Sequence, residues 1–204
     1  MTGLYRTALS AAVLLLCLGN GVPDKPPPPL ELDAAAEELL ANGEVHVTQE
    51  VWDTGGMTVG VIDVRATPEQ TMAAVMDLPA RVEDIGSLKS VDVYLQTASP
   101  ERVGAEWLLT VFGTNIIFSV LYDVDREAGW CRYSMDKSRE NGIESTEGSY
   151  QTYAHNGGTR LVYRGFSESG RYVPGFIKRW LAGSALVDQM QGMKRRAEES
   201  AGTP

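Results

Sequence analysis

The chain has 204 residues and a formal net charge of −9, with 27 acidic residues against 18 Lys and Arg. Such an acidic chain lacks the basic stripe that nucleic acids require, and it has no electrostatic attraction to anionic lipid head groups. If residues 1–21 are removed as a leader, Arg6 is lost with them. The remaining chain then has 17 basic and 27 acidic residues, a net charge of −10. We therefore exclude nucleic acid as a partner.

Residues 1–21 are predicted to be a signal peptide. Arg6 precedes an apolar run from Ala8 to Leu18 that is too short to span a bilayer. The protein is therefore expected to be exported, to the periplasm. Cys17 raises the alternative of a lipoprotein anchor, but Leu16 stands where a small residue should precede a lipidated cysteine, so an ordinary signal peptide is favoured.

A proline-rich linker, residues 22–32 (VPDKPPPPLEL), follows the leader and is expected to be an extended, stiff spacer. Residues 33–200 are long enough for one domain with its own core, and residues 201–204 are expected to be a disordered tail. The domain should begin with a short helix over 33–43, which Asp33 caps at its start and Gly43 ends.

Two strands over 44–52 and 57–66 should form a hairpin, because a Gly-Gly pair separates them. Thr67, Pro68 and Gln70 then have the spacing of a helix start with a capping box. A second short helix is expected over 80–85.

Residues 90–167 read as a meander of six strands, over 90–96, 104–112, 115–125, 129–135, 144–154 and 159–167. Asn-Gly steps mark two of its turns, and apolar residues alternate with polar ones. Trp107 and Leu109 share one face of a strand, as do Phe118, Val120 and Tyr122. We expect one sheet face to be apolar and the other to be wet.

A long final helix is predicted over 173–199, with an apolar stripe that includes Phe176, Trp180, Met190 and Met193. Something must cover that stripe, and the preceding strands are the available partner. The predicted fold class is α+β, with a curved antiparallel sheet wrapped around the C-terminal helix.

Three stretches resemble a known family. They are residues 61–77 (VIDVRATPEQTMAAVMD), the pair TEGSY (146–150) and HNGGTRLVY (155–163), and Tyr172 to Pro174 before the last helix. Across residues 33–199 the chain resembles START-like proteins of the broad Bet v 1 superfamily, in the polyketide cyclase/dehydrase and coenzyme-Q-binding-like branch. The resemblance implies a helix-grip fold with an apolar cavity. Met72 replaces the family's tryptophan, and residues 81–86 depart from its pattern at the cavity mouth, so ligand identity does not carry over.

A catalytic constellation is not found in the sequence. His46 is expected at the domain edge, and His155 precedes an Asn-Gly turn, which favours a surface position. Cys131 reads as a small buried hydrophobe. Three carboxylates, Asp63, Glu106 and Glu168, should face outward. The pair Asp123 and Asp125 is interpreted as part of a solvated face rather than a calcium-binding loop. We expect no catalytic residue, no metal and no cofactor.

The sequence thus predicts an exported, non-enzymatic protein that binds or transfers a hydrophobic ligand, a lipid, sterol or isoprenoid quinone, with transient membrane contact during transfer. The residues predicted to line its cavity are Met72, Met76, Trp107, Leu109, Phe118, Val120, Tyr122, Tyr150, Thr152, Tyr163, Phe176 and Trp180. Each methionine could equally fill the core, and each tyrosine could satisfy its hydroxyl at the barrel rim. Two alternatives stay open: a polyketide cyclase/dehydratase-like enzyme that uses the same cavity, and a partner-binding domain with a filled core.

Overall fold

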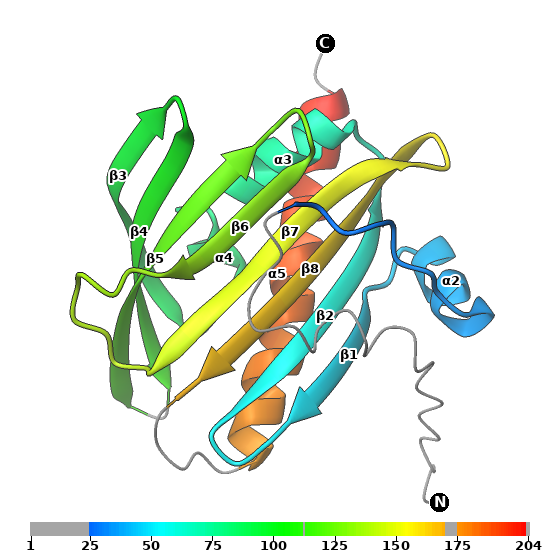
Figure 1. Ribbon diagram of the computed structural model, residues 1–204. Coiled ribbons are helices and arrows are strands. Elements are labelled where there is room, and N and C mark those ends of the chain that lie inside the picture. Colours follow the sequence, from blue (N-terminus) through cyan, green and yellow to red (C-terminus); the bar gives the residue numbers. More distant parts are fainter. Residues whose placement is uncertain (1–24, 112, 170–174, 203–204) are drawn as a thin grey trace, which may run out of the picture.

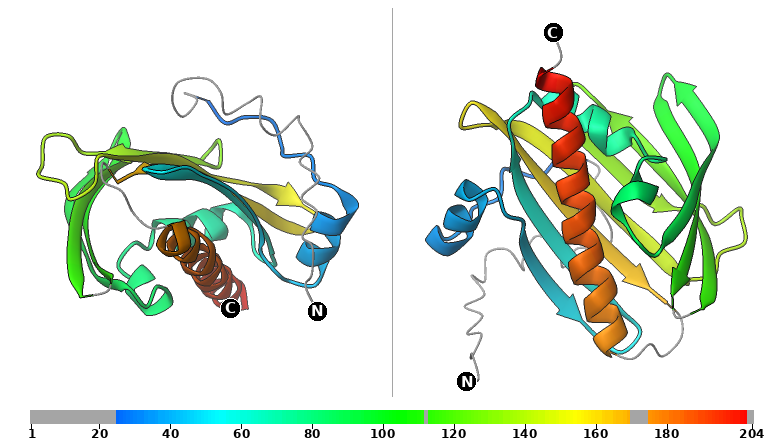
Figure 2. Two further views of the ribbon diagram at one scale, coloured as in Figure 1. Left: turned by 90° about the horizontal axis from the view of Figure 1, so that it is seen from below. Right: turned by 180° about the vertical axis from the view of Figure 1, so that it is seen from behind.

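The computed structural model describes residues 25–111, 113–169 and 175–202, with the side chains of the last range described from Ser184 onward. An eight-stranded antiparallel sheet curls over one long helix, α5 (Gly175–Gly202), which lies on its concave side (Figures 1 and 2). The predicted α+β helix-grip fold is confirmed. Among the helices that the structure describes, none is long and apolar enough to cross a membrane.

The sheet joins the N-terminal hairpin to the end of the meander. Its strands run in the order β1-β2-β8-β7-β6-β5-β4-β3, so β1 and β3 are the free edges. The contact that joins them is between β2 and β8, where Gly60 pairs with Tyr163. The strands are β1 (His46–Val51), β2 (Gly55–Val64), β3 (Leu88–Ala98), β4 (Glu101–Val111), β5 (Thr114–Asp125), β6 (Trp130–Met135), β7 (Ser145–His155) and β8 (Gly158–Glu168).

The short helices begin where capping residues were predicted. Asp33 accepts a hydrogen bond from the Ala36 amide at 2.8 Å and starts α2 (Ala34–Ala41). Thr67 and Gln70 form the predicted capping box of α3 (Pro68–Met76). A single-turn helix, α4 (Arg81–Asp84), follows at once. Because α3 and α4 both pack against α5, they complete the concave side of the domain.

The final helix packs closely on the sheet at Gly60 of β2. A Cβ atom at this position would lie 2.5 Å from Met190 Sδ and 3.0 Å from Leu186 Cδ2. Both side chains are buried, as are Met193 and Ala197 one and two turns later. This half of the apolar stripe therefore fills the core.

The convex face is not wet throughout, which corrects the sequence prediction. Val59, Val61 and Val162 point outward yet are buried, because Leu40 of α2 and the segment Leu30–Leu32 cover them. The residues alternating with Val59 and Val61 on β2 face the main core, so this strand is apolar on both faces, as expected for a strand covered on both sides.

The proline-rich segment over 25–32 is part of that cover rather than a free spacer. It runs along the convex face in an extended form (Figure 2), and Gln151 Nε2 donates to the Pro27 carbonyl at 2.7 Å. We infer that proline stiffness here pre-orders a segment that docks on the sheet, at a low cost in chain entropy.

Arg160 fastens α2 to the convex face. Its guanidinium, 3% exposed, bonds Asp63 Oδ1 at 2.8 Å and both carboxylate oxygens of Glu37 at 2.7 Å. The hydrogen bonds from Arg160 hold the pKa of Glu37 below its usual value. Asp63 thus lies on the outward face, as predicted.

Candidate functional site

Four tyrosines meet on the concave face, one from each of four neighbouring strands. They are Tyr122 on β5, Tyr133 on β6, Tyr150 on β7 and Tyr163 on β8, and we call them the tyrosine cluster. Pairing sets Tyr122 opposite Tyr133 and Tyr150 opposite Tyr163, so all four share one face. Their ring centroids lie 5.1 Å apart for Tyr150 and Tyr163, and 6.0 Å for Tyr133 and Tyr150.

A pair of glycines makes room for this cluster. Gly148 and Gly165 are directly paired between β7 and β8. A Cβ atom at Gly165 would lie 2.0 Å from the Tyr163 hydroxyl, and one at Gly148 would lie 2.5 Å from the Tyr133 hydroxyl. The two phenols can therefore lie flat across the glycines and hydrogen-bond each other at 2.8 Å.

Arg81, the first residue of α4, is fully buried beside the cluster. Its Nη1 donates to the Tyr150 hydroxyl at 3.3 Å, its Nη2 donates to the Val75 carbonyl, and its Cζ lies 5.4 Å from the Tyr150 ring centre. Gln189 of α5 also donates to the Tyr150 hydroxyl, at 2.8 Å. Tyr150 thus links α4, β7 and α5 at the middle of the domain.

Arg81, Tyr133 and Gln189 belong to this site but were not predicted from the sequence. Tyr133 could have been predicted, because it lies two residues from both Cys131 and Met135 and so shares their apolar strand face. Arg81 had none, since a four-residue helix shows no hydrophobic period and an arginine is normally read as exposed.

Burial keeps three phenols of the cluster and the Cys131 thiol in their neutral forms. It raises the pKa of Tyr122 and Tyr133 well above the usual value, and the pKa of Tyr163 is raised for the same reason. Burial also raises the pKa of the Cys131 thiol to about 12. At neutral pH these phenols are hydrogen-bonding groups rather than bases, and the thiol is not a nucleophile.

Apolar side chains of β4 and β5 continue the concave face toward the end where α5 begins. Trp107 and Phe118 stack with ring centroids 6.3 Å apart, and Val120 beside them is buried. Leu109 and Phe118 are only partly buried although they pack against the core cluster. The buried indole Nε1 of Trp107 has no hydrogen-bond partner among the described residues.

The remaining predicted lining residues have mixed positions. Met72 is buried in α3, and Met76 lies at its end, where its Sδ is 3.7 Å from Cys131 Sγ. Thr152 is buried, but its hydroxyl donates a hydrogen bond to the carbonyl of Gly129, just before β6, at 3.4 Å. The side chains of Phe176 and Trp180 lie outside the described residues.

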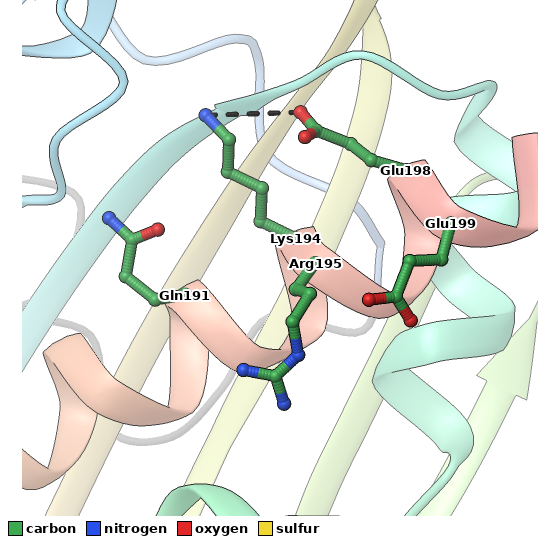
Figure 3. A pocket seen from close by; sticks show the side chains of 5 residues that line it. All are labelled: Gln191, Lys194, Arg195, Glu198 and Glu199. Carbon is green, nitrogen blue, oxygen red and sulfur yellow. Dashed lines mark ion pairs between the residues drawn. The ribbon is translucent and has the colours of Figure 1, made fainter. Parts of the chain in front are cut away.

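Two depressions on the surface are lined mostly by polar and charged residues, and no tyrosine of the cluster is among them. One, of about 370 Å³, runs along the exposed side of α5 and is lined by Gln191, Lys194, Arg195, Glu198 and Glu199 (Figure 3). Its side chains already hold α5 in place: Lys194 Nζ donates to the Asp63 carbonyl at 2.9 Å, and Gln191 donates to the Gly43 carbonyl at 3.1 Å. The other, of about 700 Å³, lies on the convex side near Glu106, Ile117 and Arg139. Neither depression is the predicted apolar cavity, and we place the candidate site on the concave face because the tyrosine cluster and the buried Arg81 meet there.

Metal chemistry has one candidate cluster in the part of the chain that the structure describes. Ligand atoms of Glu37, Asp63 and His155 lie within 4.8 Å of one another. The Arg160 guanidinium bonds both carboxylates, however, and its positive charge occupies the place that a cation would need. The arrangement is an ion-pair network that joins α2 to the sheet.

Comparisons with known proteins identify the fold. No protein-family model matches the sequence, and no curated protein matches it significantly. Among solved structures, the chain is similar to TTHA0849 from Thermus thermophilus, with a TM-score of 0.60 and 17% identity over 72% of this chain and 99% of that one. It is also similar to a STAR-related lipid transfer protein fragment from Xanthomonas axonopodis, with a TM-score of 0.59 and 12% identity over 78% of this chain and 93% of that one.

A third similar structure is the Zhui aromatase/cyclase from Streptomyces sp. R1128, with a TM-score of 0.57 and 11% identity over 78% of this chain and 97% of that one. At such low identities these likenesses establish the fold alone. The chain has the START/Bet v 1-like helix-grip fold that its sequence motifs resemble.

Proposed function

We propose that this protein binds a hydrophobic small molecule or lipid between the curved sheet and α5, and carries it without transforming it. One observation carries the proposal: Leu109 and Phe118 lie on the concave face and stay partly exposed there, beside a stacked Trp107. Apolar surface left open inside a domain is costly, and a ligand that covers it gains about 25 cal/mol per Å² buried. Entry would take place between α4 and the start of α5.

The electrostatics of the site favour binding over proton transfer. The phenols of Tyr122, Tyr133 and Tyr163 have raised pKa values because they are buried, so at neutral pH they orient a polar head group rather than abstract a proton. The likeness to a lipid transfer protein fragment is compatible with this role. Export rests on the leader over residues 1–21, and we propose a periplasmic protein, with anchoring through Cys17 as the lesser alternative.

The enzymatic alternative has one supporting observation, the buried contact between Arg81 and Tyr150 in a fold shared with an aromatase/cyclase. It predicts turnover of a polyketide chain that Tyr150→Phe abolishes. Under the carrier proposal the wild type has no turnover to lose, and Tyr150→Phe changes only the affinity for the ligand.

Solvent extraction and native mass spectrometry of the purified protein test the proposal. We expect a co-purified lipid, or else saturable binding of an apolar fluorescent probe that lipids displace. The test variant is Leu109→Arg, which places a charge on the proposed lining and should lower the affinity for the probe. Circular dichroism should show that this variant keeps the fold. Protein that is empty on isolation and binds neither the probe nor any member of a lipid panel would refute the carrier function.

A further inference from the structure

Arg81 is a buried cation with no acidic partner among the described residues. Its side chain is fully buried, and no carboxylate of the described residues forms an ion pair with it. Its two hydrogen bonds go to the Tyr150 hydroxyl and the Val75 carbonyl, neither of which is a carboxylate. Three of the five guanidinium N–H groups remain, and Nε is buried with no hydrogen-bond partner. A buried charge in this state is unusual, because desolvation is normally offset by an ion pair.

The nearest carboxylate belongs to Asp84, three residues later in α4, and it is already engaged. Arg195 Nη2 lies 3.1 Å from its Oδ1 and Arg196 Nη1 lies 2.8 Å from its Oδ2. Asp84 is therefore shared between two other arginines and forms no ion pair with Arg81 among the described residues.

The charge of Arg81 acts on the tyrosine cluster and so on the proposed ligand site. Burial raises the pKa of Tyr122, Tyr163 and Cys131, and in each case Arg81 opposes the increase, which places all three groups within reach of its field. Two buried donors near this site, Arg81 Nε and Trp107 Nε1, have no hydrogen-bond partner among the described residues. Unused donors thus gather on the concave face, next to the open apolar surface of β4 and β5.

We propose that the ligand is an amphiphile with a carboxylate head, which Arg81 binds inside the domain while its apolar chain lies along Trp107, Leu109 and Phe118. This inference rests on the proposed carrier function and specifies its ligand class. A carboxylate matches the planar guanidinium in shape and can take two parallel N–H groups, Nε–H among them. Tyr122 can donate a further hydrogen bond to the same head.

Binding of matched lipids tests the inference. Displacement of a neutral apolar probe is measured with hexadecanoic acid, hexadecanol and hexadecyl phosphate at about pH 8, where the acid is ionised. We expect the acid to bind about tenfold more tightly than the alcohol, or better, and more tightly than the bulkier phosphate. In Arg81→Met the acid should lose its advantage while the affinity for the alcohol stays the same.

Two controls separate a local effect from a general one. Arg102→Met removes a positive charge from the convex face, where Arg102 pairs with Asp123 at 2.6 Å, and it should leave the preference for the acid intact. Arg81→Lys keeps the charge but not the planar fork, and it should retain part of the preference. If Arg81→Met does not fold, the wild-type comparison and Arg81→Lys still decide.

Equal binding of acid and alcohol by the wild type, stronger binding of the phosphate, or a preference for the acid that survives Arg81→Met would overturn the inference and leave the carrier function standing. If the probe itself and all three lipids fail to bind, the carrier function fails, and the inference fails with it.

Discussion

Gly192, on the buried side of α5, gives a prediction in which two known effects oppose each other. Glycine inside a helix costs about 1 kcal/mol relative to alanine, so Gly192→Ala should stabilise the protein if helix propensity decided the outcome. A Cβ atom there would lie 2.0 Å from the Asp84 carboxylate, however, and this carboxylate is 1% exposed between Arg195 and Arg196.

The magnitudes favour destabilisation. Overpacking a filled site costs about 1–3 kcal/mol. Moving Asp84 also weakens its ion pair with Arg196, in which Nη1 lies 2.8 Å from Oδ2 and both side chains are largely buried, and breaking a buried pair is destabilising. The contact with Arg195 counts for little, because that side chain is 54% exposed. After the gain in propensity, we expect Gly192→Ala to lower the free energy of unfolding by about 1–3 kcal/mol.

A double-mutant cycle measured by urea unfolding isolates the cause. In an Asp84→Ala background the carboxylate is gone, so Gly192→Ala should now stabilise the protein by about 0.5–1 kcal/mol. The change of sign between the two backgrounds is the diagnostic result. If Gly192→Ala stabilised both backgrounds to the same extent, the close packing of α4 on α5 at Asp84 would be refuted.

Three further outcomes are expected. Gly165→Ala should lower the free energy of unfolding in urea by about 1–3 kcal/mol, because its methyl group would displace the Tyr163 hydroxyl. The control Gly86→Ala, whose methyl group would have nothing within 4 Å, should change stability by no more than about 0.5 kcal/mol. Equal costs would contradict the claim that Gly165 makes room for Tyr163. Hydrogen bonds, first that from Ser138, hold the pKa of Asp136 below its usual value, so its contribution to stability is present above about pH 4 and is lost as the pH falls through the lowered pKa. The Asp136→Asn variant should therefore be less stable at neutral pH and lose less stability on acidification. A loss of stability on acidification equal to that of the wild type would contradict this. In a Cys17→Ser background, Cys131 should stay unmodified by a disulfide reagent at about pH 8 until urea unfolds the protein, and rapid reaction of the native form would show that the site is more open than described.

The sequence predicted the features that follow from local chemistry. The capping box at Thr67, the Asn-Gly hairpin at Asn156 and the period of two in β4 and β5 each depend on residues close together in the chain, and the structure contains all three. The same alternation placed Trp107 with Leu109 on one face of β4 and Phe118 with Val120 on one face of β5, and the structure brings the rings of Trp107 and Phe118 together in a stack.

The features that were missed depend on contacts between distant segments. The docking of Leu30 and Leu32 on the convex face could not be read from a proline-rich stretch, although the apolar residues on both faces of β2 were a usable signal. The burial of Arg81 depends on α4 being enclosed by α3, β7 and α5, and local patterns do not reveal such an enclosure.

The central claim, a lipid held on the concave face, can be tested most directly by photo-crosslinking. A hexadecanoic acid with a diazirine near the middle of its chain would be bound, irradiated and mapped by peptide mass spectrometry. We predict labelling on β4 and β5, within residues 101–125, that hexadecanoic acid competes away and that Arg81→Met reduces. Labelling confined to the convex face or to the exposed side of α5, or no saturable labelling at all, would contradict the account.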